Sequence, residues 1–287
     1  MWELLFQPFA EFGFMRRALM GCIAISVGGT PVGVFLLLRR MSLAGDAMAH
    51  AILPGAAVGF LIAGFSLGAM TIGGLVAGMA VALLSGFVAR VTALREDASL
   101  AAFYLISLAI GVLIVSTRGS NVDLMHVLFG TVLALDNAAL ILLCSIASIT
   151  LIAVALIFRL LVLECADPQF LRAVSGLSAV THFTFLALVV MNLVGGFHAL
   201  GTLMAVGIMI LPAAAARFWA TSIGGLIVAA VIIAIASSVC GLLASYYFGL
   251  PSGPAVILVA GVVYGISLTV GPLGSLVASV VRHRINA

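Results

Sequence analysis

Long apolar runs, separated by short polar or glycine-proline breaks, fill almost the whole chain. A helix needs about 20 mostly apolar residues to cross a lipid bilayer, and about nine runs approach that length. The connections between them are short except near 118–136 and 159–177. This pattern predicts an all-α polytopic membrane protein with about 8–9 transmembrane helices. The predicted spans are 18–38, 43–64, 67–89, 98–117, 137–158, 178–196, 199–216, 222–247 and 254–280.

The N-terminal segment differs from the spans. Residues 1–17 hold Glu3, Glu11 and several aromatic side chains, a composition that predicts a helix lying in the membrane interface. No stretch between the apolar runs is long enough for a water-soluble domain. The sequence therefore predicts a single membrane domain over residues 1–287, with its helix bundle in 18–280.

Composition excludes several classes of protein and site. Only 7% of the residues are charged, against about 25% in soluble domains, which excludes a water-exposed globular protein. All 12 basic residues are arginine. A P-loop ATPase site needs a lysine on the phosphates, and a Schiff-base site needs a lysine amine. If ATP drives this protein, the nucleotide must therefore bind to another chain.

The arginines favour one orientation in the membrane. Cytoplasmic loops of membrane proteins carry an excess of arginine and lysine. With the C-terminus inside, only Arg16, Arg17 and Arg118 fall on the outer side, so a cytoplasmic C-terminus is predicted. The arginines that this orientation places inside are Arg39, Arg40, Arg90, Arg95, Arg159, Arg172, Arg217, Arg282 and Arg284.

Two ionisable residues stand out inside an apolar run. Asp46 and His50 are four residues apart, so on a helix they share one face, separated by about 6 Å of rise. A carboxylate and an imidazole at this spacing can hold one divalent cation, and both suit zinc or manganese. A charged aspartate costs at least ~2.5–3.5 kcal/mol near the centre of a membrane. Pro54 and Gly55 predict a helix break one turn further on.

A structural interpretation of the same pair stays open. Ser42 can cap the helix, which would place Asp46 in the first turn, where the helix dipole favours a carboxylate. His50 would then be a hydrogen-bonded interior histidine. The D-x-x-x-H spacing alone does not decide between this interpretation and a metal site.

The outer connections hold further candidate metal contacts. Asp123 and His126 are three residues apart and can share a helix face, where they could guide a cation inward. His198 follows two glycines at an outer helix end and is a candidate second contact. A solvated loop for the first pair and an interfacial histidine for His198 are the alternatives. His182 and His283 lie at or near the inner face, and the sequence assigns them no role.

Four stretches together resemble one family of transport proteins. The run from Leu38 to Gly55, which contains Arg-Arg-Met-Ser-Leu-Ala-Gly-Asp-Ala-Met-Ala-His, resembles the signature of the zinc/manganese-type ABC transporter permeases. Three further stretches match in the same order and extend the resemblance over nearly the whole chain. They are Asp123–Gly130, Gly201–Met204 with Ile210–Ala214, and Pro251–Pro254.

The resemblance implies an assembly and a route for metal. It implies a type II ABC importer-like permease in a bacterial plasma membrane, which forms a homodimer. It also implies two separate ATP-binding subunits and an extracytoplasmic metal-binding protein as partners, with no enzymatic site on this chain. Asp46 and His50 would contact the metal, and two copies would supply two oxygens and two nitrogens around one cation. Pro54, Gly55 and Pro212 are the expected helix breaks along the pathway.

The sequence of the inner connection predicts a short helix, and the resemblance implies that this helix docks onto the ATPase. Asp167 can accept hydrogen bonds at its start, and Pro168 suits the first helical position. By resemblance, 164–176 is the coupling helix that inserts into a groove of the ATPase. An ordinary interfacial loop helix is the alternative. The residues assigned to this element are Glu164, Asp167, Pro168, Phe170 and Arg172.

The leading hypothesis is the permease subunit of an ATP-driven divalent metal importer that works by alternating access. Zinc is favoured, because two imidazoles and two carboxylates fit tetrahedral coordination; manganese comes next, and iron stays open. The alternative is a secondary transporter or channel driven by an ion gradient, with Asp46 as a proton relay. An intramembrane hydrolase using Ser66, in a G-x-S-x-G run, is a third hypothesis, but that motif needs an α/β elbow.

Overall fold

The computed structural model describes residues 2–64, 66–118 and 132–273, and every regular element in these ranges is helical. Eight of the helices are long and apolar enough to cross a membrane, and α10 is a shorter apolar helix. In chain order the helices are α1 (Trp2–Glu11), α2 (Gly13–Leu38), α3 (Ser42–Ala63), α4 (Leu67–Val91), α5 (Glu96–Arg118), the 3-10 turn η1 (Val132–Ala134), α7 (Asn137–Ala166), α8 (Pro168–Val174), α9 (Leu177–Leu200), α10 (Thr202–Ala216), α11 (Ile223–Phe248) and α12 (Ser252–Val270).

The predicted all-α membrane fold is confirmed, with local corrections at helix ends. The predicted N-terminal helix over 1–17 is α1, but it ends at Glu11, so Arg16 and Arg17 belong to α2. The span expected to end at 158 continues to Ala166. Arg159 and Glu164 therefore belong to this helix, although these polar residues had predicted that a connection begins at 159.

Helix α3 continues through the residues expected to break it. The helix includes Pro54 and ends at Ala63, and α10 likewise includes Pro212. The predicted breaks are therefore wrong. Pro54 packs on α5, because a Cβ added at Gly111 would meet its ring at 2.7 Å. Ser107 of α5 donates to the Ala51 carbonyl at 3.2 Å, so a neighbouring helix satisfies backbone near the proline.

Glycines bring α3 and α4 into backbone contact. A Cβ added at Gly55 would lie 2.0 Å from the Gly73 carbonyl oxygen, and one at Gly59 would lie 2.3 Å from that of Ala69. Only glycine allows such an approach. Gly261 belongs to a similar small-residue pair in α12, yet nothing lies within 4 Å of an added Cβ there. The spacing of glycines in the sequence therefore marks a contact in α3 but not in α12.

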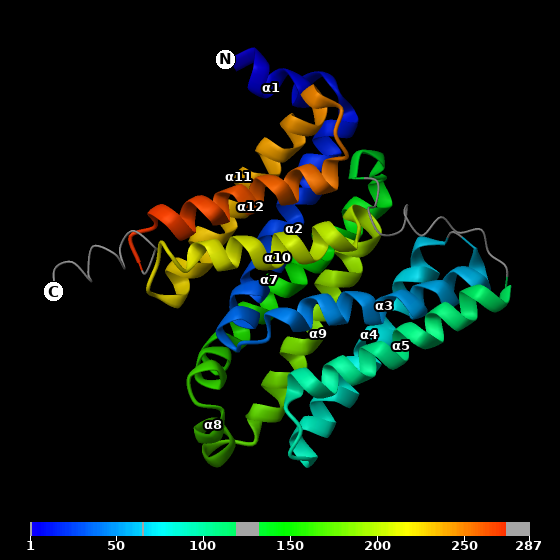
Figure 1. Ribbon diagram of the computed structural model, residues 1–287, viewed down its shortest axis with the longest axis vertical. Helices are drawn as coiled ribbons and strands as arrows, with labels where there is room; N and C mark the ends of the chain where they lie inside the picture. The colour runs from blue at the N-terminus through cyan, green and yellow to red at the C-terminus, as the bar shows by residue number, and fades with distance from the viewer. Residues whose placement is uncertain (1, 65, 119–131, 274–287) are drawn as a thin grey trace.

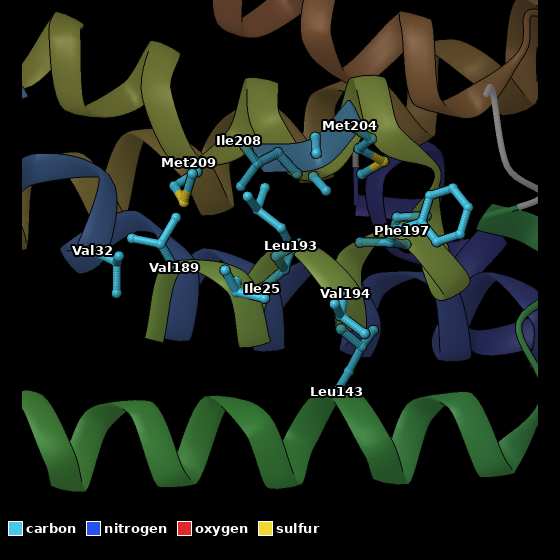
Figure 2. Packing of buried hydrophobic residues seen from close by; sticks show 14 of the residues in the cluster. Ile25, Val32, Leu143, Val189, Leu193, Val194, Phe197, Met204, Ile208 and Met209 are labelled. Carbon is cyan, nitrogen blue, oxygen red and sulfur yellow. The ribbon is translucent and has the colours of Figure 1, made fainter. Parts of the chain in front are cut away.

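The core lies around α9, which packs against α2, α4, α7 and α10. Figure 2 shows Met204 and Ile208 of α10 facing Leu193 of α9. Within this apolar core, Asn192 Nδ2 donates to Thr150 Oγ1 of α7 at 2.8 Å. A buried amide needs such a partner, and the bond ties α9 to α7.

Figure 1 shows how this arrangement separates two ends of the molecule. Helices α3, α10 and α12 lie next to one another across the middle. Helix α8 lies at the end opposite the N-terminus, close to the turn between α4 and α5. The candidate residues are distributed between these two regions.

Candidate functional site

A groove between α3, α10 and α12 contains the Asp46 and His50 pair. The cavity has a volume of about 330 Å³. Helix α3 contributes Asp46, Ala49 and His50, and α10 and α12 form the opposite wall. The wall residues are Thr202, Leu203, Val206, Gly207 and Ile257.

The two ionisable side chains face the same space, as their spacing predicts. His50 Nε2 lies 3.7 Å from Asp46 Oδ1. The Asp46 side chain is 63% exposed and that of His50 is 34% exposed. Tyr104 of α5 approaches the imidazole, with the ring centroids 6.4 Å apart and the planes 31° apart. The pair is thus close enough to share a cation and open enough to receive one.

The start of α3 lacks the cap on which the structural interpretation of Asp46 was based. Met41 occupies the N-cap position without a side-chain cap bond, and Ser42 is already helical. The expected Ser42 cap is therefore wrong, and Asp46 lies in the second turn, beyond the strongest effect of the helix dipole. Arg40, just before this start, has a φ of +58°, which is uncommon for a residue with a side chain.

No sequence pattern predicts the opposite wall of the groove. Gly201 has a φ of +88° and turns the chain from α9 into α10. A Cβ added at Gly207 would lie 2.3 Å from Ile257 Cδ1, so this glycine leaves room for the isoleucine beside the groove. The Gly201–Met204 stretch carried part of the family resemblance, but nothing in the sequence indicates that Gly207 or Ile257 faces Asp46.

Among the residues that line the groove, Asp46 and His50 alone are of the types that most often bind metals. Across residues 2–64, 66–118 and 132–273 no group of three or more His, Cys, Asp or Glu side chains gathers around one point. Zinc takes four ligands, and manganese accepts carboxylates, carbonyls and water. One carboxylate and one imidazole therefore need further ligands from water, backbone carbonyls or a second protein copy.

The other predicted metal contacts are not brought to this groove by the described part of the chain. Asp123 and His126 lie outside the described residues. His198 belongs to the last turn of α9, but its side chain is not described. The prediction that these three residues contact metal therefore stays a prediction.

The short helix predicted after Asp167 is present as α8. Asp167 Oδ1 accepts from the Gln169 and Phe170 amides at 3.0 and 2.9 Å, and Pro168 is the first helical residue. Phe170 and Val174 are exposed. This helix therefore presents two large apolar side chains to its surroundings.

Glu164 differs from the expectation for this element. Its side chain is buried at the end of α7, where Ser178 Oγ donates to Glu164 Oε1 at 3.2 Å. It therefore ties α7 to α9 and does not lie on an exposed docking surface. Arg172 lies in the last turn of α8 and lines a second cavity.

Ser66 occupies a structural position. Its hydroxyl accepts from the Ala69 amide at 3.5 Å and caps the start of α4. Ser66 therefore lies at the start of a helix, and the strand that a nucleophile elbow requires does not occur in the described ranges.

Comparison with known proteins identifies related sequences and structures. Residues 11–271 match the ABC 3 transport family. The chain is 30% identical over 283 residues to the manganese transport system membrane protein MntC of Listeria monocytogenes, covering 98% of this chain and 99% of that protein. It is also 30% identical to the manganese import system permease protein ScaB of Streptococcus gordonii, covering 93% and 94%.

A solved structure shares the fold. The chain aligns with a chain of PsaBC from Streptococcus pneumoniae, solved in complex with a Fab, with a TM-score of 0.82 and 27% identity. The alignment covers 94% of this chain and 96% of that chain. Sequence and structure comparisons therefore agree over nearly the whole length.

Proposed function

The chain belongs to the ABC 3 transport family, and on that premise we propose that it is the permease subunit of an ATP-driven manganese importer. The observation that carries the proposal is the Asp46–His50 pair, which opens into a groove between three helices. A carboxylate in an apolar segment is costly, and binding of a divalent cation offsets that cost.

The identity of the metal rests on the relatives together with ligand chemistry. The similar proteins of Listeria and Streptococcus are named as manganese systems. Carboxylate, carbonyl and water oxygens suit manganese, and imidazole binds it as well as zinc. The tetrahedral argument from the sequence favours zinc instead, so zinc and iron are the competing cargoes that an experiment must include.

A second copy of the chain would complete the site. In the single chain, the groove leaves the Asp46 carboxylate more than half exposed. A two-fold axis beside α3 would bring a second Asp46 and His50 to the same cation. Two carboxylates would then neutralise its double positive charge. This homodimer is part of the proposal.

The end of the molecule that carries α8 would bind the ATP-binding subunit. Five arginines line the cavity beside α8, namely Arg39, Arg40, Arg90, Arg95 and Arg172. This concentration supports a cytoplasmic location for that end. The exposed Phe170 and Val174 of α8 would dock into an ATP-binding subunit. ATP hydrolysis there would switch the groove between outward and inward access, after an extracytoplasmic protein delivers the metal.

The test is manganese uptake by proteoliposomes that contain the permease and its ATPase subunit, with the binding protein outside. We expect Asp46→Asn and His50→Ala each to lower uptake by about 100-fold, because each removes a direct ligand of the metal. Loss of a residue that only orients a metal ligand already lowers metal affinity or activity by about 10–100-fold. Glu11→Gln, which removes an exposed carboxylate of α1, is the matched control and should transport normally.

Two outcomes would contradict the proposal. Normal uptake by both groove variants would reject the site. Uptake that survives ATP depletion at a constant membrane potential would favour the gradient-driven transporter instead. Competition by zinc and iron in the same assay identifies the preferred metal.

A further inference from the structure

A second polar cavity lies at the α8 end of the molecule, separate from the Asp46 groove. Its volume is about 640 Å³. Polar residues from six helix ends line it, including the end of α2, the end of α4, the start of α5 and the start of α9. The residues that matter here are Arg39, Arg90, Glu96, Glu164 and His182.

His182 stands at the centre of this cavity wall. Its side chain is only 4% exposed. Arg39 Nη2 lies 2.6 Å from His182 Nδ1, and His182 Nε2 lies 3.0 Å from Glu96 Oε1. The second contact has ion-pair distance, although Glu96 Oε1 does not meet hydrogen-bond geometry. The imidazole thus bridges a guanidinium on α2 and a carboxylate on α5.

The chemistry of the partners fixes the form of the ring. A guanidinium can only donate hydrogen bonds, so His182 Nδ1 must accept from Arg39. The neutral ring then carries its proton on Nε2, the nitrogen beside Glu96. His182 therefore accepts from Arg39 and places its protonated nitrogen 3.0 Å from the Glu96 carboxylate, a combination that no apolar side chain can reproduce.

The bridge joins the α8 region to the helix of the metal groove. On one side, His182 lies in the second turn of α9, directly after α8. On the other side, Arg39 caps the end of α2, and the chain enters α3 only three residues later. Between them Arg40 has the positive φ that forms the corner. The contacts of His182 therefore link the start of α9 to the corner that leads into α3, which carries Asp46.

Further bonds anchor the first turns of α9. Arg90 Nη2 donates to the Ser178 carbonyl at 3.3 Å, and Ser178 Oγ donates to Glu164 Oε1 at 3.2 Å. The guanidinium of Arg39 also lies over the Phe185 ring, 5.0 Å from its centroid. The start of α9 and the α2–α3 corner are thus held as one unit at this end.

Some polar atoms of the cavity remain unpaired among the described residues. Arg39 Nη1, Arg90 Nε and Glu164 Oε2 are buried and have no hydrogen-bond partner there. Each of these buried groups carries a desolvation penalty, so the polar contacts at this end are incompletely satisfied in this arrangement of the helices.

We propose that His182, through its contacts with Arg39 and Glu96, is a positioning residue that couples movement of α8 and α9 to the α3 helix of the metal groove. The coupling part of this inference rests on the proposed function, since it assumes that a partner ATPase moves α8. Its structural part, that His182 holds the α2–α3 corner in place, stands independently of transport.

The first experiment measures manganese transported per ATP hydrolysed in the proteoliposome assay. His182→Phe keeps an aromatic ring beside Phe183 but removes both nitrogens. We expect the ratio to fall by about 5-fold or more, the lower end of typical coupling between sites, while ATP hydrolysis continues. His182→Gln retains one acceptor and one donor and should restore most of the ratio.

Thr181→Val is the matched control for this measurement. Thr181 is a buried neighbour on α9 whose hydroxyl has no hydrogen-bond partner among the described residues, so its change should leave the ratio within about 2-fold of wild type, which corresponds to ~0.4 kcal/mol. A wild-type ratio in His182→Phe, an equal fall in Thr181→Val, or a failure of His182→Gln to recover would each overturn the proposal.

The second experiment needs no transport. Hydrogen exchange of the backbone amides of residues 39–46 in the purified permease should quicken about 5-fold or more in His182→Phe, as expected for local opening. Exchange should stay near wild type in His182→Gln and Thr181→Val. Unchanged exchange in His182→Phe would overturn the positioning role. If that variant does not fold, Arg39→Gln and Glu96→Gln provide the same comparison from the two partners.

The two experiments separate failure of this inference from failure of the proposed function. If the wild-type protein does not transport metal with ATP, the proposed function fails, and the exchange result alone decides whether His182 holds the corner. If wild-type transport is normal but neither measurement responds to His182→Phe, only the positioning role fails.

Discussion

Two histidine-carboxylate pairs of this protein have similar separations and different surroundings. His50 Nε2 lies 3.7 Å from Asp46, and His182 Nε2 lies 3.0 Å from Glu96. The first pair opens into a groove whose other lining residues carry no charge. The second is nearly buried, and its imidazole accepts from Arg39.

The difference leads us to expect that the neighbours of each pair, more than its separation, decide its role. An imidazole whose second nitrogen already accepts from a guanidinium has no lone pair left for a metal. The nearby arginines also repel a cation. The exposed pair has neither obstacle. A cation is therefore expected at Asp46 and His50, whereas Glu96 and His182 link helices.

Direct metal binding to the purified permease gives the largest expected contrast between the two pairs. Asp46→Asn should weaken manganese binding by about 100-fold, because it removes a direct ligand at the exposed pair. Glu96→Gln should change the affinity by less than about 3-fold, equivalent to ~0.6 kcal/mol. Titration calorimetry with manganese measures both values. An equal loss of affinity in the two variants would remove the distinction between the pairs.

A substitution on the far side of α3 from Asp46 tests the close packing of α3 on α4. Gly55→Ala places a methyl group 2.0 Å from the Gly73 carbonyl oxygen, and overpacking of this kind costs about 1–3 kcal/mol. Thermal unfolding in detergent measures the loss. Gly261→Ala, whose added methyl group meets nothing within 4 Å, should leave stability unchanged or slightly higher, because alanine is the better helix former. Equal stability of the two variants would contradict the close α3–α4 contact.

The smallest expected effect concerns the wall of the groove opposite Asp46. Gly207→Ala should push the Ile257 side chain aside, because the new methyl group would lie 2.3 Å from its Cδ1. We expect manganese uptake to fall about 3-fold, equivalent to ~0.6 kcal/mol. The contact between His182 and Glu96 should not change. Adding Ile257→Val, which shortens the opposing side chain, should restore uptake. A loss that the second change does not relieve would place the cause outside this groove.

Much of the fold could be predicted because a membrane imposes a simple rule on sequence. Apolar runs long enough to cross a bilayer gave the order of the helices, and Asp167 with Pro168 gave the start of α8. The prediction of helix ends was wrong where a residue that usually interrupts a membrane helix has a partner in a neighbouring helix. Glu164 suggested a loop, yet Ser178 pairs with it inside the bundle. Pro54 suggested a break, yet α5 packs on it and α3 continues.

The candidate site was predictable only in part, for a related reason. Asp46 and His50 share a helix face by spacing alone, so local geometry was enough to pair them. His182 showed no pattern at all, because its partners are 143 residues away at Arg39 and in another helix at Glu96. Spacing along a chain cannot reveal contacts between helices that lie far apart in sequence.

By itself, the sequence determined that this chain is a helical membrane protein, that it holds no lysine for a P-loop ATPase site, and that Asp46 and His50 share one helix face. These conclusions follow from hydropathy, from the absence of lysine and from helix periodicity, which are local properties. The tertiary structure decided that α10 and α12 complete a groove beside that pair, and that three helices meet at His182. Those facts depend on how helices pack, because only packing brings together side chains from distant parts of the chain.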